Sequence, residues 1–298
     1  MKKLIIIILF FFVSFSLGAN WIAMKIAVKT IPPIFATSLR FLLVSPLLIV
    51  IAYINNITLL FPKKERFFQF LISFFYFSVP FALMIYAAQY INNILSALIF
   101  SNIPVLMLIN RSYIQKEKIQ NVQIMGVFIV IVSFLFFTVF NLGMHNFYKY
   151  KGWIALLCAA LCHSYIYVYL WKKKLNHLSV ITFNALPSLL SGITLLIVSI
   201  CIEHPSIYCF SYSSIKSILF LSYCSGFLGI VAYFYLQKEI NSFYASTVFL
   251  TFPIIVIILE HFMYRKYINI YEILLIIFFI FGSVVAILPN KKLKKSKN

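Results

Sequence analysis

Eight side chains that can hydrogen-bond a small solute, or pack a ring against it, stand within or beside long uncharged stretches of this sequence. They are Asn20, Trp21, Tyr86, Gln89, His163, Tyr167, Tyr235 and Gln237. Polar groups in apolar surroundings are costly without partners, so they mark a cavity or, for a lone Asn or Gln, more often a contact between helices. The set offers donors, acceptors and ring faces but no carboxylate. It therefore suits a neutral or zwitterionic solute better than a cation, whose charge nothing there would neutralise.

The densest of these polar stretches is His163-Ser164-Tyr165-Ile166-Tyr167-Val168-Tyr169. His163 and Tyr167 are four residues apart, so on a helix they share one face. They could line a cavity, hydrogen-bonding an amino or carboxylate group while their rings pack on apolar parts of a solute. They could also belong to the belt of aromatic residues that marks a membrane surface. Both interpretations stay open for these two residues, and the belt is favoured for Tyr169.

No pattern in the chain predicts catalysis, a metal site or a cofactor. The sequence contains no Asp, no His-Glu-x-x-His, no Gly-x-Ser-x-Gly and no phosphate-binding glycine loop. Its five cysteines are odd in number and match no zinc or redox spacing. Glu260 has His261 and Arg265 beside it, so we expect an ion pair at the membrane surface rather than a proton relay. These features favour a protein that binds a solute over an enzyme.

The elements that hold these residues are long apolar helices. No charged residue occurs from Phe67 to Asn110, and a hydrocarbon core about 30 Å thick needs roughly 20 apolar residues per helix. Hydrophobic residues make up 63% of the chain and the mean hydropathy is +1.01, well above the values of a soluble domain. The net charge of +19 does not indicate a nucleic-acid partner, because the basic residues are scattered between apolar runs. Attraction to the lipid bilayer accounts for it.

Charges and turn residues divide the chain into ten predicted helices, which makes it an all-α polytopic membrane protein. No segment between them is long enough for a soluble domain, so we expect a single membrane domain over 1–298. The first helix could instead be a signal peptide cut after Ala19, but apolar sequence continues to Met24 and favours a retained span. The predicted spans are residues 4–24, 34–54, 67–88, 93–111, 119–140, 152–171, 178–201, 215–236, 243–263 and 268–288.

The positions of the Lys and Arg residues predict the orientation in the membrane. With both termini in the cytoplasm, 17 of the 25 fall in cytoplasmic segments, including a Lys-rich tail at 291–298, and eight fall outside. Cytoplasmic loops carry the excess of basic residues in membrane proteins. We therefore expect a multi-pass protein of the cell inner membrane with both ends in the cytoplasm.

The sequence also indicates an internal repeat. Residues 95–104 line up with residues 244–253 at an offset of 149, which also places Tyr86 on Tyr235. Five spans per half is an odd number, so the second half would enter the membrane from the opposite side, as in many alternating-access transporters. Chance similarity between helices rich in Ile, Leu and Phe is the alternative. The two repeats are expected at about 4–140 and 152–288.

Two motifs near the start resemble the EamA family of the drug/metabolite transporter superfamily. Gly18-Ala19-Asn20-Trp21 followed by Lys25 is similar to that family's first-helix motif, although Leu17 stands where a Trp is usual. Residues 31–41, which begin Ile31-Pro32-Pro33 and end Arg40-Phe41, resemble its entry to the second span. Arg40 would lie near the outer interface, where it could reach the headgroups or cap helix carbonyls.

Later motifs extend the resemblance over nearly the whole chain. Pro104, followed by Glu117-Lys118, is similar to the family's fourth-span motif. In the second half Pro253 matches as well, but Lys266 stands where a Glu is usual. The departures weaken any inference about one particular solute and leave the fold untouched.

This resemblance implies ten helices in two inverted five-helix repeats and secondary transport of small metabolites, often amino acids or their derivatives. One alternative is an exporter of larger or cationic organic compounds. A membrane-embedded enzyme or a non-transporting assembly factor is an alternative from another class. The expected partners are a small-molecule solute and the lipid bilayer. The identity of the solute, the direction of transport, ion coupling and the oligomeric state stay open.

Overall fold

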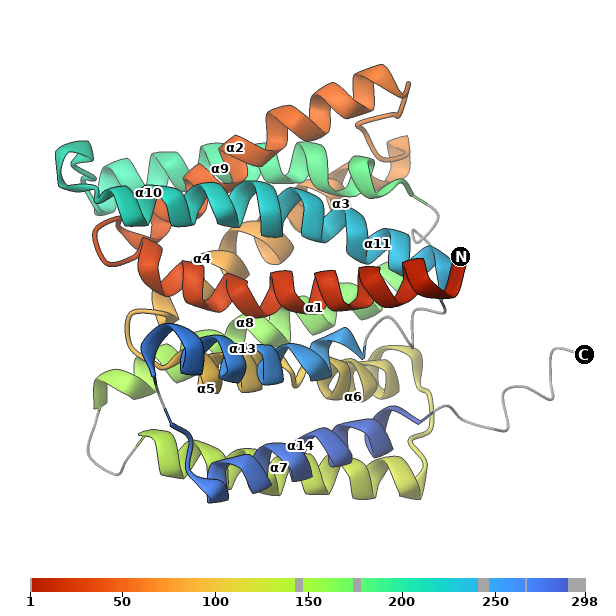
Figure 1. Cartoon of the computed structure of the whole chain (residues 1–298). Coiled ribbons are helices and arrows are strands. Elements are labelled where there is room, and N and C mark those ends of the chain that lie inside the picture. Colours follow the sequence, from red (N-terminus) through yellow and green to blue (C-terminus); the bar gives the residue numbers. More distant parts are fainter. Residues whose placement is uncertain (1, 143–146, 174–177, 241–246, 266, 289–298) are drawn as a thin grey trace, which may run out of the picture.

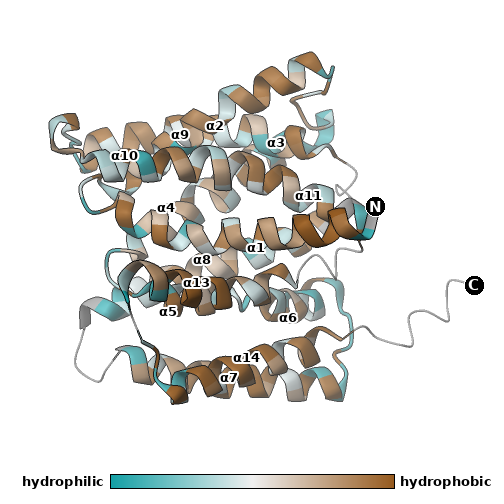
Figure 2. Ribbon diagram, viewed as in Figure 1, coloured by the Kyte–Doolittle hydropathy of each residue, from teal (hydrophilic) through white to brown (hydrophobic). Residues whose placement is uncertain are grey.

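The computed structural model describes residues 2–142, 147–173, 178–240, 247–265 and 267–288. Within these ranges the regular structure is helical and no strand occurs. The long helices run side by side in one bundle, parallel or antiparallel to one another (Figure 1). Hydrophobic residues cover the middle of the helices, and hydrophilic residues gather toward the two ends of the bundle (Figure 2). A helical bundle with an apolar middle is one of the few structures that can satisfy its backbone polar groups inside a membrane.

The first half of the chain crosses the bundle five times. Its third and fourth crossings are each built from more than one helical segment. The elements are α1 (Lys2–Ala27), α2 (Pro33–Ile54), a third crossing of η1 (Lys63–Glu65), α3 (Arg66–Ile72), η2 (Ser73–Ser78) and α4 (Val79–Ala87), a fourth of α5 (Asn93–Phe100) and α6 (Ile103–Gln115), and α7 (Asn121–Leu142).

The second half follows the same plan. Its eighth crossing, like the third, contains a π-helical segment between two α-helices. The elements are α8 (Phe147–Lys172), α9 (Val180–Ile202), the short η4 (Ile207–Cys209), an eighth crossing of α10 (Tyr212–Leu219), η5 (Phe220–Gly229) and α11 (Ile230–Glu239), then α13 (Val248–Tyr264) and α14 (Ile270–Ile287).

The predicted all-α membrane fold is confirmed by these elements. In the described part of the chain nine helices are long and apolar enough to cross a membrane, and α13 is a further apolar helix of 17 residues. The predicted start of that span, residue 243, lies outside the described residues, as does the Lys-rich tail 291–298. The helices of the structure match the spans predicted from the sequence, because the charges and prolines that end the apolar runs also lie at the ends of the helices.

The two halves are arranged as an inverted repeat requires. Helix α1 begins at the right of Figure 1 and runs left, whereas α8 begins at the left and runs right. Helix α2 packs along α9, and α7 packs along α14, so each of these helices contacts its own counterpart. Shifted by 149 residues, η2 falls inside η5, so both halves carry a π-helical segment at the same place. The second half therefore repeats the local irregularities of the first as well as its helices.

Small residues let the paired helices approach closely. The hydroxyl of Ser38 on α2 donates to the carbonyl of Gly192 on α9 at 2.9 Å. Between α7 and α14, a Cβ on Gly126 would lie 2.8 Å from both the carbonyl oxygen of Gly282 and the Cα of Ala286. Helices in lipid gain little from the hydrophobic effect, so close van der Waals packing of this kind holds them together.

The fourth crossing turns between α5 and α6 at Ser101 and Asn102. The Ser101 hydroxyl donates to the carbonyl of Ala97 at 2.9 Å, and the Asn102 amide donates to the carbonyl of Leu98 at 3.0 Å. The carbonyl of Ala97 also accepts from the backbone N–H of Ser101 at 2.9 Å. The backbone N–H of Asn102 bonds to Ile99 instead of Leu98, and the Asn102 side chain supplies the donor for the Leu98 carbonyl. Irregular backbone is tolerated at membrane depth where side chains or a cavity receive it, and π-helical segments are frequent at functional sites.

Polar contacts between the halves close both ends of the bundle. Where α1 begins, Lys173 donates to the Glu65 carboxylate at 2.8 Å, and this hydrogen bond raises the pKa of Lys173. At the opposite end, the Glu203 carboxylate accepts from the backbone N–H groups of Ile34 and Phe35, both at 2.9 Å. Glu203 of the second half thus caps the positive end of α2 in the first.

We expect Gly126→Ala to destabilise the protein by about 1–3 kcal/mol, because the added methyl meets the backbone of α14 and forces α7 away from it. The measurement is thermal unfolding of the purified protein in detergent. Gly229→Ala is the matched control, because the nearest atom to its new Cβ would be 3.4 Å away. Equal unfolding temperatures for the two variants would contradict the close contact between α7 and α14.

Candidate functional site

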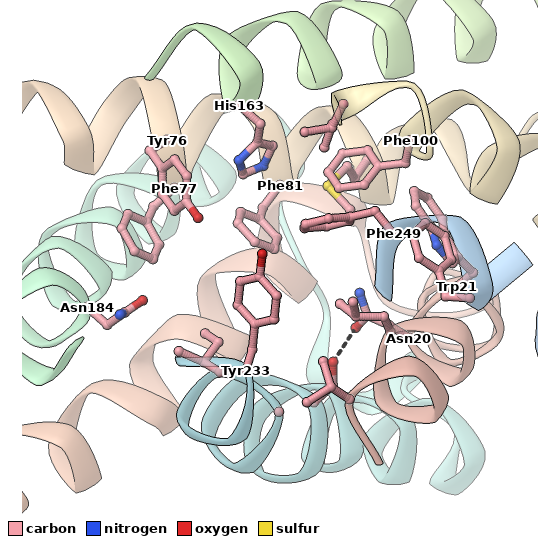
Figure 3. A pocket seen from close by; sticks show the side chains of 18 of the residues that line it. Asn20, Trp21, Tyr76, Phe77, Phe81, Phe100, His163, Asn184, Tyr233 and Phe249 are labelled. Carbon is pink, nitrogen blue, oxygen red and sulfur yellow. Dashed lines mark hydrogen bonds between the residues drawn. The ribbon is translucent and has the colours of Figure 1, made fainter. Parts of the chain in front are cut away.

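A cavity of about 110 Å³ lies between the two halves of the bundle. It is bordered by the π-helical segments η2 and η5, and by Phe100 and Ile103 on either side of the turn between α5 and α6. Figure 3 shows side chains of both halves converging on it. The lining residues are Val13, Leu17, Asn20, Trp21, Arg40, Tyr76, Phe77, Phe81, Met84, Phe100, Ile103, His163, Tyr167, Asn184, Ser225, Gly229, Ile230, Tyr233, Phe249 and Phe252.

Many of the lining residues occur in pairs separated by 149 positions, so the repeat builds the cavity from equivalent parts of each half. The chemistry of the two members often differs, which makes the two walls unlike. These pairs are Tyr76 and Ser225, Phe81 and Ile230, Met84 and Tyr233, Phe100 and Phe249, and Ile103 and Phe252.

His163 sits in an aromatic box on one side of the cavity. Its ring lies edge-on to Tyr76, Phe81 and Phe100, with ring centroids 4.7, 5.4 and 5.4 Å away. The side chain is 4% exposed, and its Nε2 has no hydrogen-bond partner among the described residues. Tyr233 enters from the opposite side with its hydroxyl directed toward Phe81 (Figure 3). A buried ring nitrogen with no partner in the protein is available to a bound molecule.

Two hydrogen bonds link the halves across the cavity wall. The Tyr76 hydroxyl donates to the Tyr167 hydroxyl at 2.7 Å, which leaves the Tyr167 proton for another acceptor. On the other side, the Ser225 hydroxyl donates to the side-chain oxygen of Asn20 at 3.1 Å (Figure 3). The Asn20 amide nitrogen is not used by this bond. The cavity therefore presents hydroxyl and amide donors in addition to the faces of aromatic rings.

Arg40 also lines the cavity, which corrects the expected position at the outer interface. Its side chain is 4% exposed, and the guanidinium carbon lies 4.8 Å from the centre of the Phe81 ring. The Nη1 atom has no hydrogen-bond partner among the described residues, so Arg40 does not cap helix carbonyls through this atom. The helix pair α2–α9 holds the residue in place, because Ser38 and Gly192 bring the two backbones together two residues before it.

These donors, acceptors and ring faces can bind a solute. No three His, Cys, Asp or Glu side chains gather as metal ligands in the described ranges. All six Glu residues fall within those ranges, and none of them lines the cavity.

Comparison with known families identifies this architecture. The pattern of the EamA-like transporter family matches residues 4–139 and, a second time, residues 150–288. The chain belongs to the EamA-like transporter family. The two matches coincide with the two halves of the bundle, so the two repeats of five helices are those of the family. The chain is accordingly a multi-pass membrane transporter.

Relatives of this EamA-like transporter span nearly all of it. A Buchnera aphidicola (subsp. Schizaphis graminum) protein named "Uncharacterized transporter" is 50% identical over 289 residues, which are 97% of this chain and 96% of that protein. "Protein PagO" of Salmonella typhimurium is 43% identical over 290 residues, covering 97% and 95%. One crystal structure, 12% identical, superposes with a TM-score of 0.66 over 100% of this chain and 99% of its own, which shows the shared fold alone.

The structure brings together four of the eight residues singled out in the sequence and places three others, Tyr86, Gln89 and Tyr235, outside the cavity lining. Asn20, Trp21, His163 and Tyr167 line the cavity. Tyr86 packs against Tyr90 near the end of α4, with ring centroids 4.9 Å apart, and Gln89 is exposed in the turn that follows. Tyr235 is 50% exposed on the outside of α11, and the side chain of Gln237 lies outside the described residues.

The repeat-related pair Tyr86 and Tyr235 is displaced by two residues from the pair that reaches the cavity. Met84 and Tyr233 line it instead. Each helical residue turns about 100°, so a shift of two residues moves a side chain to the opposite face. Hydropathy does not distinguish the faces of a helix that is apolar all round. The sequence therefore indicates the 149-residue repeat, but it does not indicate which residues of these helices face the cavity.

Five polar side chains of the cavity were not among the eight: Arg40, Tyr76, Asn184, Ser225 and Tyr233. Tyr76 lies in the π-helical segment η2, which changes the register of the faces and hides it from a helical pattern. Asn184 on α9 donates to the carbonyl of Val180 at 2.7 Å and was recognisable as a polar residue inside a span. Arg40 was recognisable as a charge in an apolar run, but only the packing of α2 on α9 shows which way it faces.

The pair Tyr233 and Tyr235 tests the placement of the cavity. We expect Tyr233→Ala to lower solute uptake about tenfold, which corresponds to about 1.4 kcal/mol, because it removes a ring and a hydroxyl from the cavity. Tyr235→Ala removes the same group from the outer surface of α11, so uptake should stay at the wild-type rate. Uptake into proteoliposomes measures both variants. A loss confined to Tyr235→Ala would place the cavity on the other face of α11.

Proposed function

We propose that this transporter carries small metabolites, amino acids or their derivatives, through the central cavity by alternating access. The observation that carries the proposal is one buried cavity lined by repeat-equivalent residues of two inverted halves. In transporters of this kind the site lies near the middle of the membrane, between repeats that rock against each other. Interrupted helices commonly form such sites, and here η2, η5 and the two residues that flank the α5–α6 turn, Phe100 and Ile103, border the cavity.

The size and lining of the cavity favour a small amphipathic solute. One water needs about 10–15 Å³ of such space, so a cavity of about 110 Å³ has room for roughly ten water-sized groups. Phenyl, phenol and indole rings supply apolar contact, and Tyr167, His163 and Asn20 supply hydrogen bonds. A molecule with one polar end and one apolar end matches both kinds of wall.

The contacts at the two ends of the bundle are those that alternating access would have to break. At one end the halves are joined by the cap of Glu203 on α2 and by the hydrogen bond from Asn93 to Glu260, at 2.9 Å. At the other end they are joined by Lys173 and Glu65. Opening one end while the other stays joined gives the solute access to one side at a time.

A panel of solutes tests this function directly. Purified protein in liposomes is offered the twenty protein amino acids, and uptake is followed by mass spectrometry against empty liposomes. We expect time-dependent uptake of a subset with apolar side chains. Tetraethylammonium and ethidium are offered in parallel and should not enter, because a buried Arg40 repels cations and none of the six Glu residues reaches the cavity.

Other results of that panel would replace the proposal. Uptake of the two cations alone would favour an exporter of cationic organic compounds. Uptake of nothing by protein that remains folded would favour the membrane-embedded enzyme or the assembly factor over amino-acid transport.

The orientation is proposed together with the function. The end of the bundle where α1 begins carries Lys63, Lys64, Lys116, Lys118 and Lys173, and its basic excess supports a cytoplasmic position for both termini. We expect a reporter fused after Asn298 to be active only if it is an enzyme that works in the cytoplasm. A reporter inserted after His204, between α9 and α10, should be active only outside. Activity of both reporters on one side would contradict this topology.

A further inference from the structure

The guanidinium of Arg40 is a buried positive charge without a counter-charge. Its side chain is 4% exposed, it has no carboxylate within ion-pair distance among the described residues, and Nη1 has no hydrogen-bond partner there. Its guanidinium carbon lies over the face of the Phe81 ring, 4.8 Å from the ring centre. A ring face attracts a cation only weakly, and burying an unpaired charge is costly.

Every acidic residue that could have neutralised Arg40 is placed elsewhere. Glu203 is bound to the start of α2, Glu260 to Asn93, and Glu272 accepts from Asn141 at 3.0 Å. The remaining acidic side chains lie toward the bundle ends, where Glu65 pairs with Lys173 and Glu117 and Glu239 are exposed. No Glu of this chain therefore supplies a counter-charge to Arg40.

The groups around Arg40 are donors suited to an oxyanion. The Arg40 guanidinium lies over the face of Phe81, and the His163 ring is nearly perpendicular to Phe81 with ring centroids 5.4 Å apart, so both side chains contact one aromatic ring. His163 has an unpartnered Nε2, and Tyr167 keeps its proton for another acceptor because Tyr76 donates to it. Guanidinium presents its N–H groups as a planar fork that fits both oxygens of a carboxylate.

We propose that Arg40 anchors the carboxylate of the transported solute, so that the transporter selects solutes by a carboxylate and does not require their amino group. This deepens the proposed function and rests on it. The apolar part of the solute then extends along the rings of Phe81, Phe100 and Phe249. The residues singled out in the sequence include no carboxylate, and Arg40 adds a positive charge to them.

Matched ligands test the anchor through binding, without any need for transport. The thermal unfolding of the purified full-length protein in detergent is measured with leucine, with 4-methylpentanoate, which lacks the amino group, and with 3-methylbutylamine, which lacks the carboxylate. The same three forms of phenylalanine and alanine complete the panel. We expect both carboxylates of at least one set to raise the unfolding temperature, because they bind the folded state, and the amine to leave it unchanged.

Variants of Arg40 separate recognition from structure. Arg40→Gln should weaken carboxylate binding about ten- to a hundredfold. Arg40→Lys keeps the charge but not the planar fork, so its affinity for the carboxylate should fall by less. Arg66→Gln removes the same charge from the exposed end of α3 and should bind carboxylates like the wild type. Without ligand, Arg40→Gln should be at least as stable as the wild type, because it removes an unpaired buried charge.

Several outcomes would overturn the anchor. They are equal stabilisation by the amine, no stabilisation by any carboxylate of the panel, a lower stability of ligand-free Arg40→Gln, and a full effect of sodium chloride alone at the same concentration. Amino-acid flux that is unchanged in Arg40→Gln would reject the anchor and leave the proposed function standing. Arg40-dependent carboxylate binding with no flux would reject the function and leave the anchor.

Discussion

A polar group in the hydrocarbon core of a membrane has no water to bond, so it must find its partner within the protein. The described helices meet this demand locally wherever they can. The hydroxyls of Thr37, Ser96 and Ser217 each donate to the carbonyl four residues earlier, at 2.8, 2.8 and 2.9 Å. The same demand ties the halves to each other through Ser38, Asn93 and Glu203. A few buried side-chain atoms of the described residues have no hydrogen-bond partner, and two of them, the Nη1 of Arg40 and the Nε2 of His163, border the same cavity.

Duplication explains how this cavity is built and why it is not symmetric. The repeat supplies equivalent positions from each half, with a π-helical segment in both, so equivalent residues of the two halves line the cavity. Substitution then made the walls chemically different. Ser225 occupies the position in the second half that Tyr76 occupies in the first, and Tyr233 is likewise equivalent to Met84. The residue 149 positions after Arg40 is Leu189, so only the first half contributes the charge. A solute with one charged end and one apolar end fits such an uneven pair of walls.

The rigid and movable parts of the bundle follow from the same contacts. Helices α2 and α9 touch through small residues, as do α7 and α14, and these packed pairs stand at opposite margins of the bundle (Figure 1). The cavity lies among the helices between them. The polar contacts at the two ends are fewer and nearer to water, where Lys173 and Glu65 are screened and exchange partners easily. Tightly packed helix pairs at the margins, with weaker polar contacts at the two ends of the bundle, suit two halves that move as rigid bodies around the central cavity.

The amino-acid sequence by itself determined the helical class, the span boundaries, the 149-residue repeat and four residues of the cavity. These follow from composition and from order along the chain: apolar runs of spanning length end at charges and prolines, and Asn20 and His163 are polar residues within such runs. The tertiary structure alone decided which face of each helix meets the cavity. It replaced Tyr86 and Tyr235 with Met84 and Tyr233, and it moved Arg40 from the expected surface to the site. The physical reason is that lipid and protein interior are both apolar, so hydropathy does not record which way a side chain faces, and only the packing of neighbouring helices sets it.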